Sequence, residues 1–227
     1  VTSGVMTNVS FDDDAEERDY APKTDALMVS LERLSDNKRL STSVSFSYLR
    51  EDNGVLGTGG TGGLSFVDHT YSQGVTLGSS LRMTKNTRIS ASYTEAFSDA
   101  DTSSNSLLAL NSSNLSSSAF ALGLQAKQIL RADDTLSFSI SQPLRIGGGS
   151  MSLTHDDYYD EDETLHSRSV DIDLRPNGRQ MDYQLEYVFS PRLDKLRMGL
   201  FAYYSDEYLH QESLTDHGIG FRLNKTF

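Results

Sequence analysis

The chain has no cysteine, no tryptophan and only 4 prolines among its 227 residues. Without cysteine it cannot form a disulfide, a thiolate metal site or a thiol nucleophile. It also has no run of about 18 apolar residues, the length that a membrane-spanning helix requires. The densest apolar stretch, Ala119 to Leu124, is far shorter. These absences exclude disulfide scaffolds, zinc knuckles and helical membrane proteins.

Apolar residues are scarce as well. They make up 37% of the chain, and the mean hydropathy is −0.44. The core of a soluble domain of this size normally draws on nearly half of the residues. A membrane β-barrel needs fewer, because it turns apolar side chains to lipid on one face and polar side chains to a lumen on the other. The composition is therefore compatible with a barrel.

The formal net charge is −12, which argues against nucleic-acid binding, since phosphates attract a basic surface. Carboxylates cluster in stretches 11–19 and 156–163 too densely to pack in a core. Their oxygens suit Ca²⁺ or Mg²⁺, but neither stretch has the EF-hand spacing. We predict solvated charge at a barrel rim, bridged to lipopolysaccharide by divalent ions, and neither a metal site nor a cofactor.

The strongest pattern is a period-two alternation in segments of about ten residues. It is clearest at 40–48, where leucine, threonine, valine, phenylalanine and tyrosine alternate with four serines. A strand buried on both faces would not carry a row of serines, and a helix would scatter them around its circumference. The pattern predicts an all-β fold: a transmembrane antiparallel up-and-down β-barrel.

About twelve strands are expected in one outer-membrane domain over residues 1–227. Short connections alternate with long ones, as in outer-membrane barrels, and an even count puts both termini on the periplasmic side. The expected strands are 1–11, 25–34, 39–50, 72–84, 87–98, 116–130, 135–144, 149–159, 165–174, 180–190, 195–206 and 213–227. The polar positions predicted to face the lumen are Ser41, Ser43, Ser45, Ser47, Asp171, Asp173, Asp182, Gln184, Glu186, Arg197 and Arg222.

The last expected strand has a characteristic spacing of polar, glycine, aromatic and apolar residues that resembles the signal read by the barrel-assembly machinery. Its residues are Asp216, Gly218, Phe221 and Leu223, followed by the terminal Phe227. The alternative is an ordinary amphipathic edge strand of a soluble sheet.

Two segments, Ser45 to Leu64 and Asp134 to Ile146, resemble the C-terminal translocator barrel of subtilisin-like serine protease autotransporters, as does Pro176 to Tyr183. The resemblance implies a twelve-stranded barrel in the bacterial outer membrane that anchors an N-terminal passenger and assists its export. It implies as partners outer-membrane lipid and lipopolysaccharide, the assembly machinery, and the chain's own passenger segment or pore helix. No passenger residues are present, and we expect Val1 to follow a removed leader or an excised domain.

Two other functions stay open: a passive pore or structural adhesin barrel, and a barrel hydrolase. The hydrolase requires an acid and a base, for which His210 with Asp206 or Glu207, and His217 with Asp216, are the candidates. Neighbouring residues of a strand point to opposite faces, which makes the second pair poor. We predict that the chain is not an enzyme and that its histidines lie in polar rim loops.

Overall fold

The computed structural model of the chain describes residues 2–6, 24–52, 54–55, 58–59, 68–101, 108–110, 115–159, 165–191 and 196–225. The side chains of both predicted acidic stretches, 11–19 and 156–163, lie outside the described part, as does Phe227. No helix in the described ranges is long and apolar enough to cross a membrane.

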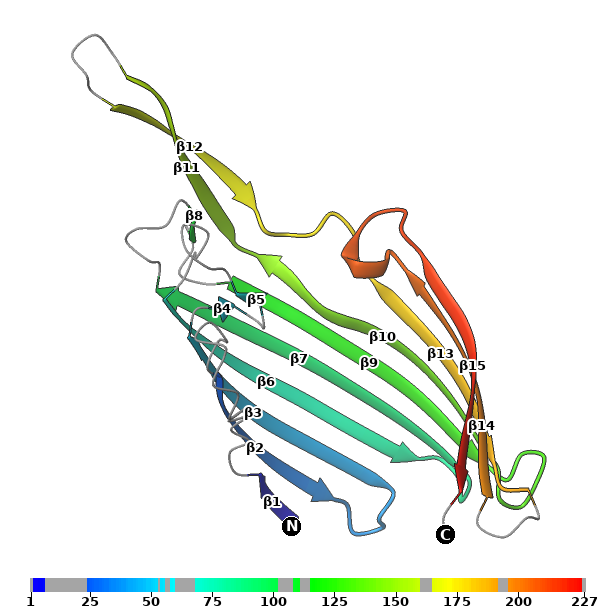
Figure 1. Cartoon of the computed structure of the whole chain (residues 1–227). Coiled ribbons are helices and arrows are strands. Elements are labelled where there is room, and N and C mark those ends of the chain that lie inside the picture. The colour runs from blue at the N-terminus through cyan, green and yellow to red at the C-terminus, as the bar shows by residue number, and fades with distance from the viewer. Residues whose placement is uncertain are drawn as a thin grey trace.

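The fold is one large antiparallel sheet in which each strand pairs with the next strand of the sheet along the chain (Figure 1). Its order is β1-β2-β3-β6-β7-β9-β10-β13-β14-β15. The strands of this sheet are β1 (Thr2–Met6), β2 (Thr24–Leu34), β3 (Leu40–Asp52), β6 (His69–Arg82), β7 (Thr87–Asp101), β9 (Leu115–Lys127), β10 (Thr135–Gly148), β13 (Met181–Phe189), β14 (Leu196–Asp206) and β15 (Asp216–Lys225).

We call this ten-stranded sheet the wall, and two smaller sheets lie outside it. β4 (Gly54–Val55) pairs with β5 (Thr58–Gly59), and β8 (Leu108–Leu110) joins the hairpin of β11 (Ser150–Tyr159) and β12 (Leu165–Asp173). A short 3-10 turn, η2 (Tyr208–His210), lies between β14 and β15.

The prediction of about twelve wall strands is wrong at 149–159 and 165–174. These segments do form strands, β11 and β12, but β10 pairs directly with β13. The hairpin leaves the wall at Gly149, whose φ of 142° turns the chain away from β10. Period-two alternation cannot distinguish a strand of the wall from a strand of a hairpin that lies outside it. The described wall therefore has ten strands, and Asp171 and Asp173 lie in β12, outside it.

Short turns join β2 to β3, β6 to β7 and β9 to β10 at one end of the sheet, which we call the turn end, and we call the opposite end the loop end (Figure 1). In the β6–β7 turn, the Thr84 hydroxyl accepts the backbone N–H groups of Asn86 (3.1 Å) and Thr87 (3.0 Å). In the β2–β3 turn, Lys38 takes a left-handed φ of 54°. β1 begins and β15 ends at the turn end, as an even strand count predicts (Figure 1).

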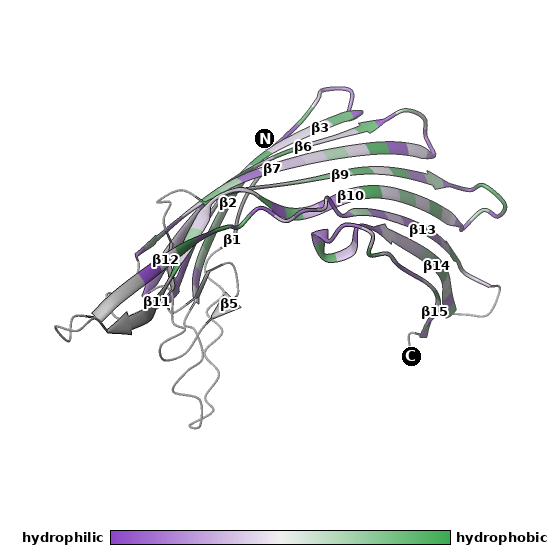
Figure 2. Ribbon diagram, turned by 90° about the horizontal axis from the view of Figure 1, so that it is seen from above, coloured by the Kyte–Doolittle hydropathy of each residue, from purple (hydrophilic) through white to green (hydrophobic). Residues whose placement is uncertain are grey.

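The sheet curves into a wide arc whose edges, β1 and β15, do not pair within the described residues (Figure 2). We predicted a closed ring, because unpaired edge groups are costly in hydrocarbon. The structure shows the curved wall, and closure stays a prediction.

Candidate lumen and loop-end rim

One face of the wall is predominantly polar from β2 to β15. Residues opposite each other in register share a face, so the pairings trace rows across the sheet. One such row consists of Glu32, Ser43, Gly78, Ser92, Ala121, Ser141, Asp182, Ser205 and Asp216. The next row consists of Ser41, Ser80, Ser90, Gly123, Ser139, Gln184, Tyr203 and Gly218. We call this surface the polar face.

The polar face is built from small side chains that bond to one another. Hydroxyls pair across strands at Ser30 and Ser45 (2.7 Å), and at Thr76 and Thr94 (2.9 Å). Elsewhere a serine lies over a glycine: a Cβ at Gly123 would lie 2.7 Å from the Ser90 hydroxyl oxygen. Small residues leave the space above the wall free, as a water-filled lumen requires.

The opposite face is apolar. One of its rows consists of Leu40, Leu81, Ile89, Leu124, Phe138, Leu185, Ala202 and Ile219. Ile219 is 90% exposed and Leu77 52%. A hollow of about 540 Å³ is lined mainly by apolar side chains of β13, β14 and β15. Tyr48 stacks on Tyr71 across β3 and β6 at a centroid distance of 6.4 Å. Such a surface matches lipid, with aromatic residues at the interfaces.

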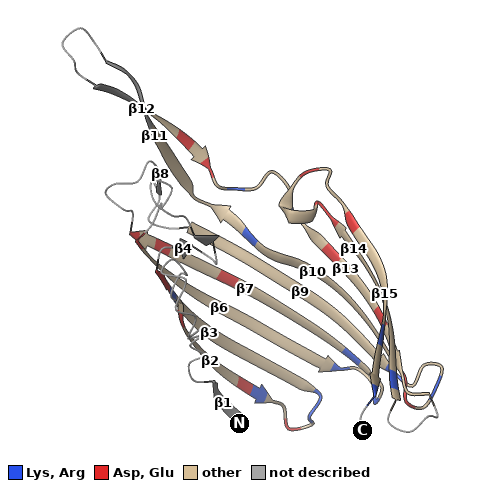
Figure 3. Ribbon diagram, viewed as in Figure 1, with Lys and Arg blue, Asp and Glu red and all other residues tan. Residues whose placement is uncertain are grey.

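Charges are separated along the wall. Among the described residues, Lys and Arg lie mainly at the turn end and Asp and Glu mainly at the loop end (Figure 3). On the polar face, Asp182 and Asp216 lie at the loop end, and Arg197 and Arg222 at the turn end. Arg222 pairs with Glu186 at 3.8 Å. A solute crossing along the polar face would meet carboxylates at one mouth and cations at the other.

The structure places the predicted site residues on two surfaces. Apart from Asp171 and Asp173, the predicted lumen residues, from Ser41 to Arg222, all lie on the polar face. In β15, Phe221 and Leu223 lie on the apolar face, whereas Asp216 and Gly218 lie on the polar face. Whether these residues line a lumen or signal assembly stays a prediction.

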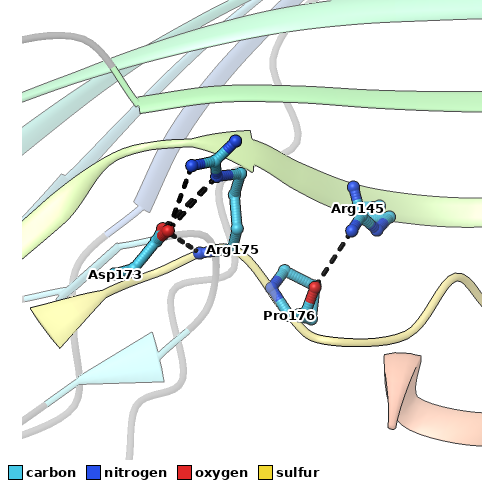
Figure 4. Close-up of polar contacts among 4 residues, drawn as sticks. All are labelled: Arg145, Asp173, Arg175 and Pro176. Atoms are coloured by element: carbon cyan, nitrogen blue, oxygen red, sulfur yellow. Dashed lines mark hydrogen bonds and ion pairs between the residues drawn. The ribbon is translucent and has the colours of Figure 1, made fainter. Parts of the chain in front are cut away.

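Hydrogen bonds join the loops at the ends of β10, β13, β14 and β15 into one unit, which we call the rim assembly and which the sequence pattern does not predict. Arg145 of β10 donates from Nη2 to the Pro176 carbonyl at 2.9 Å (Figure 4). Its Nε donates to the Gly178 carbonyl, also at 2.9 Å. Beside it, the backbone N–H and the guanidinium of Arg175 both donate to the Asp173 carboxylate (Figure 4). These bonds lower the pKa of Asp173, and the backbone N–H has the larger effect. The linker from β12 to β13 is thereby fixed against the wall.

His210 completes this assembly. Its Nδ1 accepts the backbone N–H of Gln180 at 2.9 Å, and its Nε2 lies 3.2 Å from the Leu144 carbonyl. The neutral tautomer with the proton on Nε2 satisfies both contacts. The side chain of Gln180, 8% exposed, accepts from the Leu209 N–H and donates to Asp182. The His210 imidazole therefore links the β14–β15 loop to the start of β13 and to β10.

The predicted acid–base pairs do not form. His210 bonds backbone groups, and His217 and Asp216 lie on opposite faces of β15. A pair that the sequence did not suggest does form: His69 Nδ1 lies 2.9 Å from Asp52 Oδ1, with Arg50 at 3.5 Å from the same oxygen. These residues are adjacent only through the β3–β6 register, which a single sequence does not show.

The β9–β10 turn is held by a buried carboxylate, Asp134, 2% exposed. It accepts the backbone N–H groups of Ile129 (2.7 Å), Leu130 (2.8 Å) and Arg131 (2.9 Å). The Tyr187 hydroxyl of β13 donates to it at 2.8 Å. Burial acts to raise the pKa of Asp134, but these donors outweigh it and the pKa lies below its usual value.

Asp134→Asn is expected to lower the urea midpoint of unfolding at pH 7. The amide N–H₂ would face at least one backbone N–H, and since both are donors, a buried donor would be left without an acceptor. Because the pKa of Asp134 is lower in the folded state, its carboxylate stabilises the fold at pH values above the unfolded-state pKa of about 4. This stabilisation is lost as the pH falls through the folded-state pKa. The wild-type midpoint should therefore drop on acidification more than that of the variant. Asp133→Asn, in the exposed neighbour, is the control. An equal pH dependence in both variants would contradict this role.

No protein-family model matches the chain, and no curated protein is significantly similar to it in sequence. The fold is similar to that of TodX, the toluene transporter of Pseudomonas putida, with a TM-score of 0.52 and 12% identity over 91% of this chain. The alignment spans 61% of TodX. The chain therefore shares with TodX the fold of a large antiparallel β-sheet, and the comparisons give no support to the autotransporter resemblance.

Proposed function

We propose that the chain forms the wall of a passive pore in the bacterial outer membrane, with its apolar face toward lipid and both termini in the periplasm. The observation that carries this proposal is the separation of the two faces over the whole meander, from β2 to β15. Strands of 13 to 15 residues, such as β3 and β7, extend about 45 Å and span the hydrocarbon layer when tilted.

The solute is a hydrophilic small molecule. Serine, threonine and glycine dominate the polar face, and the large apolar hollows at Leu185 and at Phe46 lie mainly on the opposite face. A toluene-like solute would require an apolar lining. The proposal therefore shares transport with TodX and differs from it in the class of solute.

Translocation of a passenger is the second candidate, favoured by the resemblance around Ser45 and Asp134. It predicts that the reading frame upstream of Val1 encodes a signal peptide and a large subtilisin-like domain. A signal peptide alone would exclude it.

Planar-bilayer conductance tests the pore. We expect the purified chain to give stepwise, ohmic openings, and Ser139→Trp to reduce the step size because Ser139 lies mid-wall on the polar face. Phe138→Trp is the matched control on the apolar face, and it should conduct like the wild type. Folded protein without openings, or equal conductance in both variants, would contradict the proposal.

A further inference from the structure

Four basic side chains surround one hollow at the turn end of β6, β7 and β9. Arg82 ends β6, Lys85 lies in the turn, Arg88 lies in β7 and Lys127 ends β9. Together with Asn86, Thr87 and Gln125 they line a cavity of about 260 Å³. In a chain with 20 basic and 32 acidic residues, this hollow has no acidic residue in its lining.

Two of the cations lie directly opposite each other. Arg82 pairs with Arg88 in the β6–β7 register, on the same face as the pair Ser80 and Ser90. Opposite residues in an antiparallel pair have their Cβ atoms about 5 Å apart, and like charges there are destabilising. A wall that retains this pair needs a counter-charge above it.

The described carboxylates do not supply that charge. None of the ion pairs among the described side chains includes Arg82, Lys85, Arg88 or Lys127. On the polar face, Glu32 lies on β2, beyond β3, and bonds the Ser41 hydroxyl. Glu186 lies on β13, beyond β9 and β10, and pairs with Arg222. The hollow is therefore cationic.

We infer that this hollow binds a phosphate group. The forked guanidinium groups of Arg82 and Arg88 match two oxygens each, and Lys85 and Lys127 add point charges at the mouth. The group belongs either to a solute in the lumen or to a phospholipid headgroup at the membrane edge. The location inside the lumen rests on the proposed pore, whereas the phosphate chemistry does not.

Calorimetric titration of the folded chain in detergent micelles with inorganic pyrophosphate tests the site. Arg82→Gln with Arg88→Gln should weaken binding by at least about tenfold. The control is Arg33→Gln with Lys38→Gln, which also removes two positive charges at the turn end but outside the hollow. It should leave the dissociation constant for pyrophosphate within about twofold of the wild-type value. No binding by the wild type, or equal loss in both double variants, would overturn the inference.

The source of the phosphate is separated by analysing lipid that copurifies from outer membranes. Anionic phospholipid retained by the wild type and lost in Arg82→Gln with Arg88→Gln assigns the site to a headgroup. Pyrophosphate binding without retained lipid assigns it to a solute. Conductance of the same preparation distinguishes the two proposals: binding without openings refutes only the pore, and openings without binding of either ligand refute only the phosphate site.

Discussion

Gly220→Ala is expected to destabilise the sheet by about 1–3 kcal/mol, the usual effect of overpacking. Phe201 of β14 lies opposite Gly220 of β15, and its ring covers the glycine. A Cβ at Gly220 would lie 2.5 Å from Phe201 Cε1 and 2.8 Å from Cε2, well inside contact distance. In an open strand position the same change would stabilise by about 0.5–1 kcal/mol, so the expected sign is reversed here.

A double-mutant cycle with Phe201→Ala, measured by urea unfolding in lipid vesicles, isolates this contact. In the Phe201→Ala background Gly220→Ala should no longer destabilise. Gly147→Ala is the control, since a Cβ there would meet Ser116 only at 3.6 Å. Equal effects of Gly220→Ala in both backgrounds would show that the ring does not require the glycine.

Gly178→Ala is expected to detach the β12–β13 linker from the β14–β15 loop. A Cβ at Gly178 would lie 2.8 Å from the His210 carbonyl oxygen and 2.9 Å from the backbone of Gln211 and Glu212. These are backbone atoms, which cannot turn aside as a side chain can. The bond from the Gly178 N–H to the His210 carbonyl, 2.9 Å, should be lost with the contact.

Limited trypsin digestion measures this detachment, because Arg179 directly follows the glycine and is a trypsin site. We expect cleavage after Arg179 to accelerate at least about tenfold, as the free energy of local opening falls by more than 1.4 kcal/mol. The wall itself should keep its unfolding midpoint. Gly147→Ala serves again as the control, and unchanged cleavage in Gly178→Ala would refute the role of the rim assembly.

Period-two alternation was enough to predict the meander, because most wall strands, such as β3, have one apolar and one polar face. It failed at β11 and β12, where Met151, Leu153, Val170 and Ile172 also alternate with polar residues. Alternation reports that a strand has two different faces, and it does not report which strand is its neighbour. In the structure, β10 pairs with β9 on one side and with β13 on the other, so β11 and β12 have no place in the wall.

The contacts that join distant segments could not be predicted from one sequence. Asp134 stood in a segment noted for its family resemblance, but its bonds to Tyr187 and to the preceding turn depend on the β10–β13 register. Arg82 and Arg88 are neighbours across a short turn, and the spacing of the turn could have revealed them. His210 and Gln180 meet only because two loops fold onto the same rim.

The absence of cysteine permits a direct test of the central claim, that one face of the wall is wet and the other lies in lipid. Single cysteines at Ser90 and Ser139 on the polar face, and at Ile89 and Phe138 on the apolar face, are labelled in liposomes with a charged maleimide. We predict fast labelling of Ser90→Cys and Ser139→Cys and protection of Ile89→Cys and Phe138→Cys. Equal labelling of the two faces, or protection of the polar one, would contradict the account.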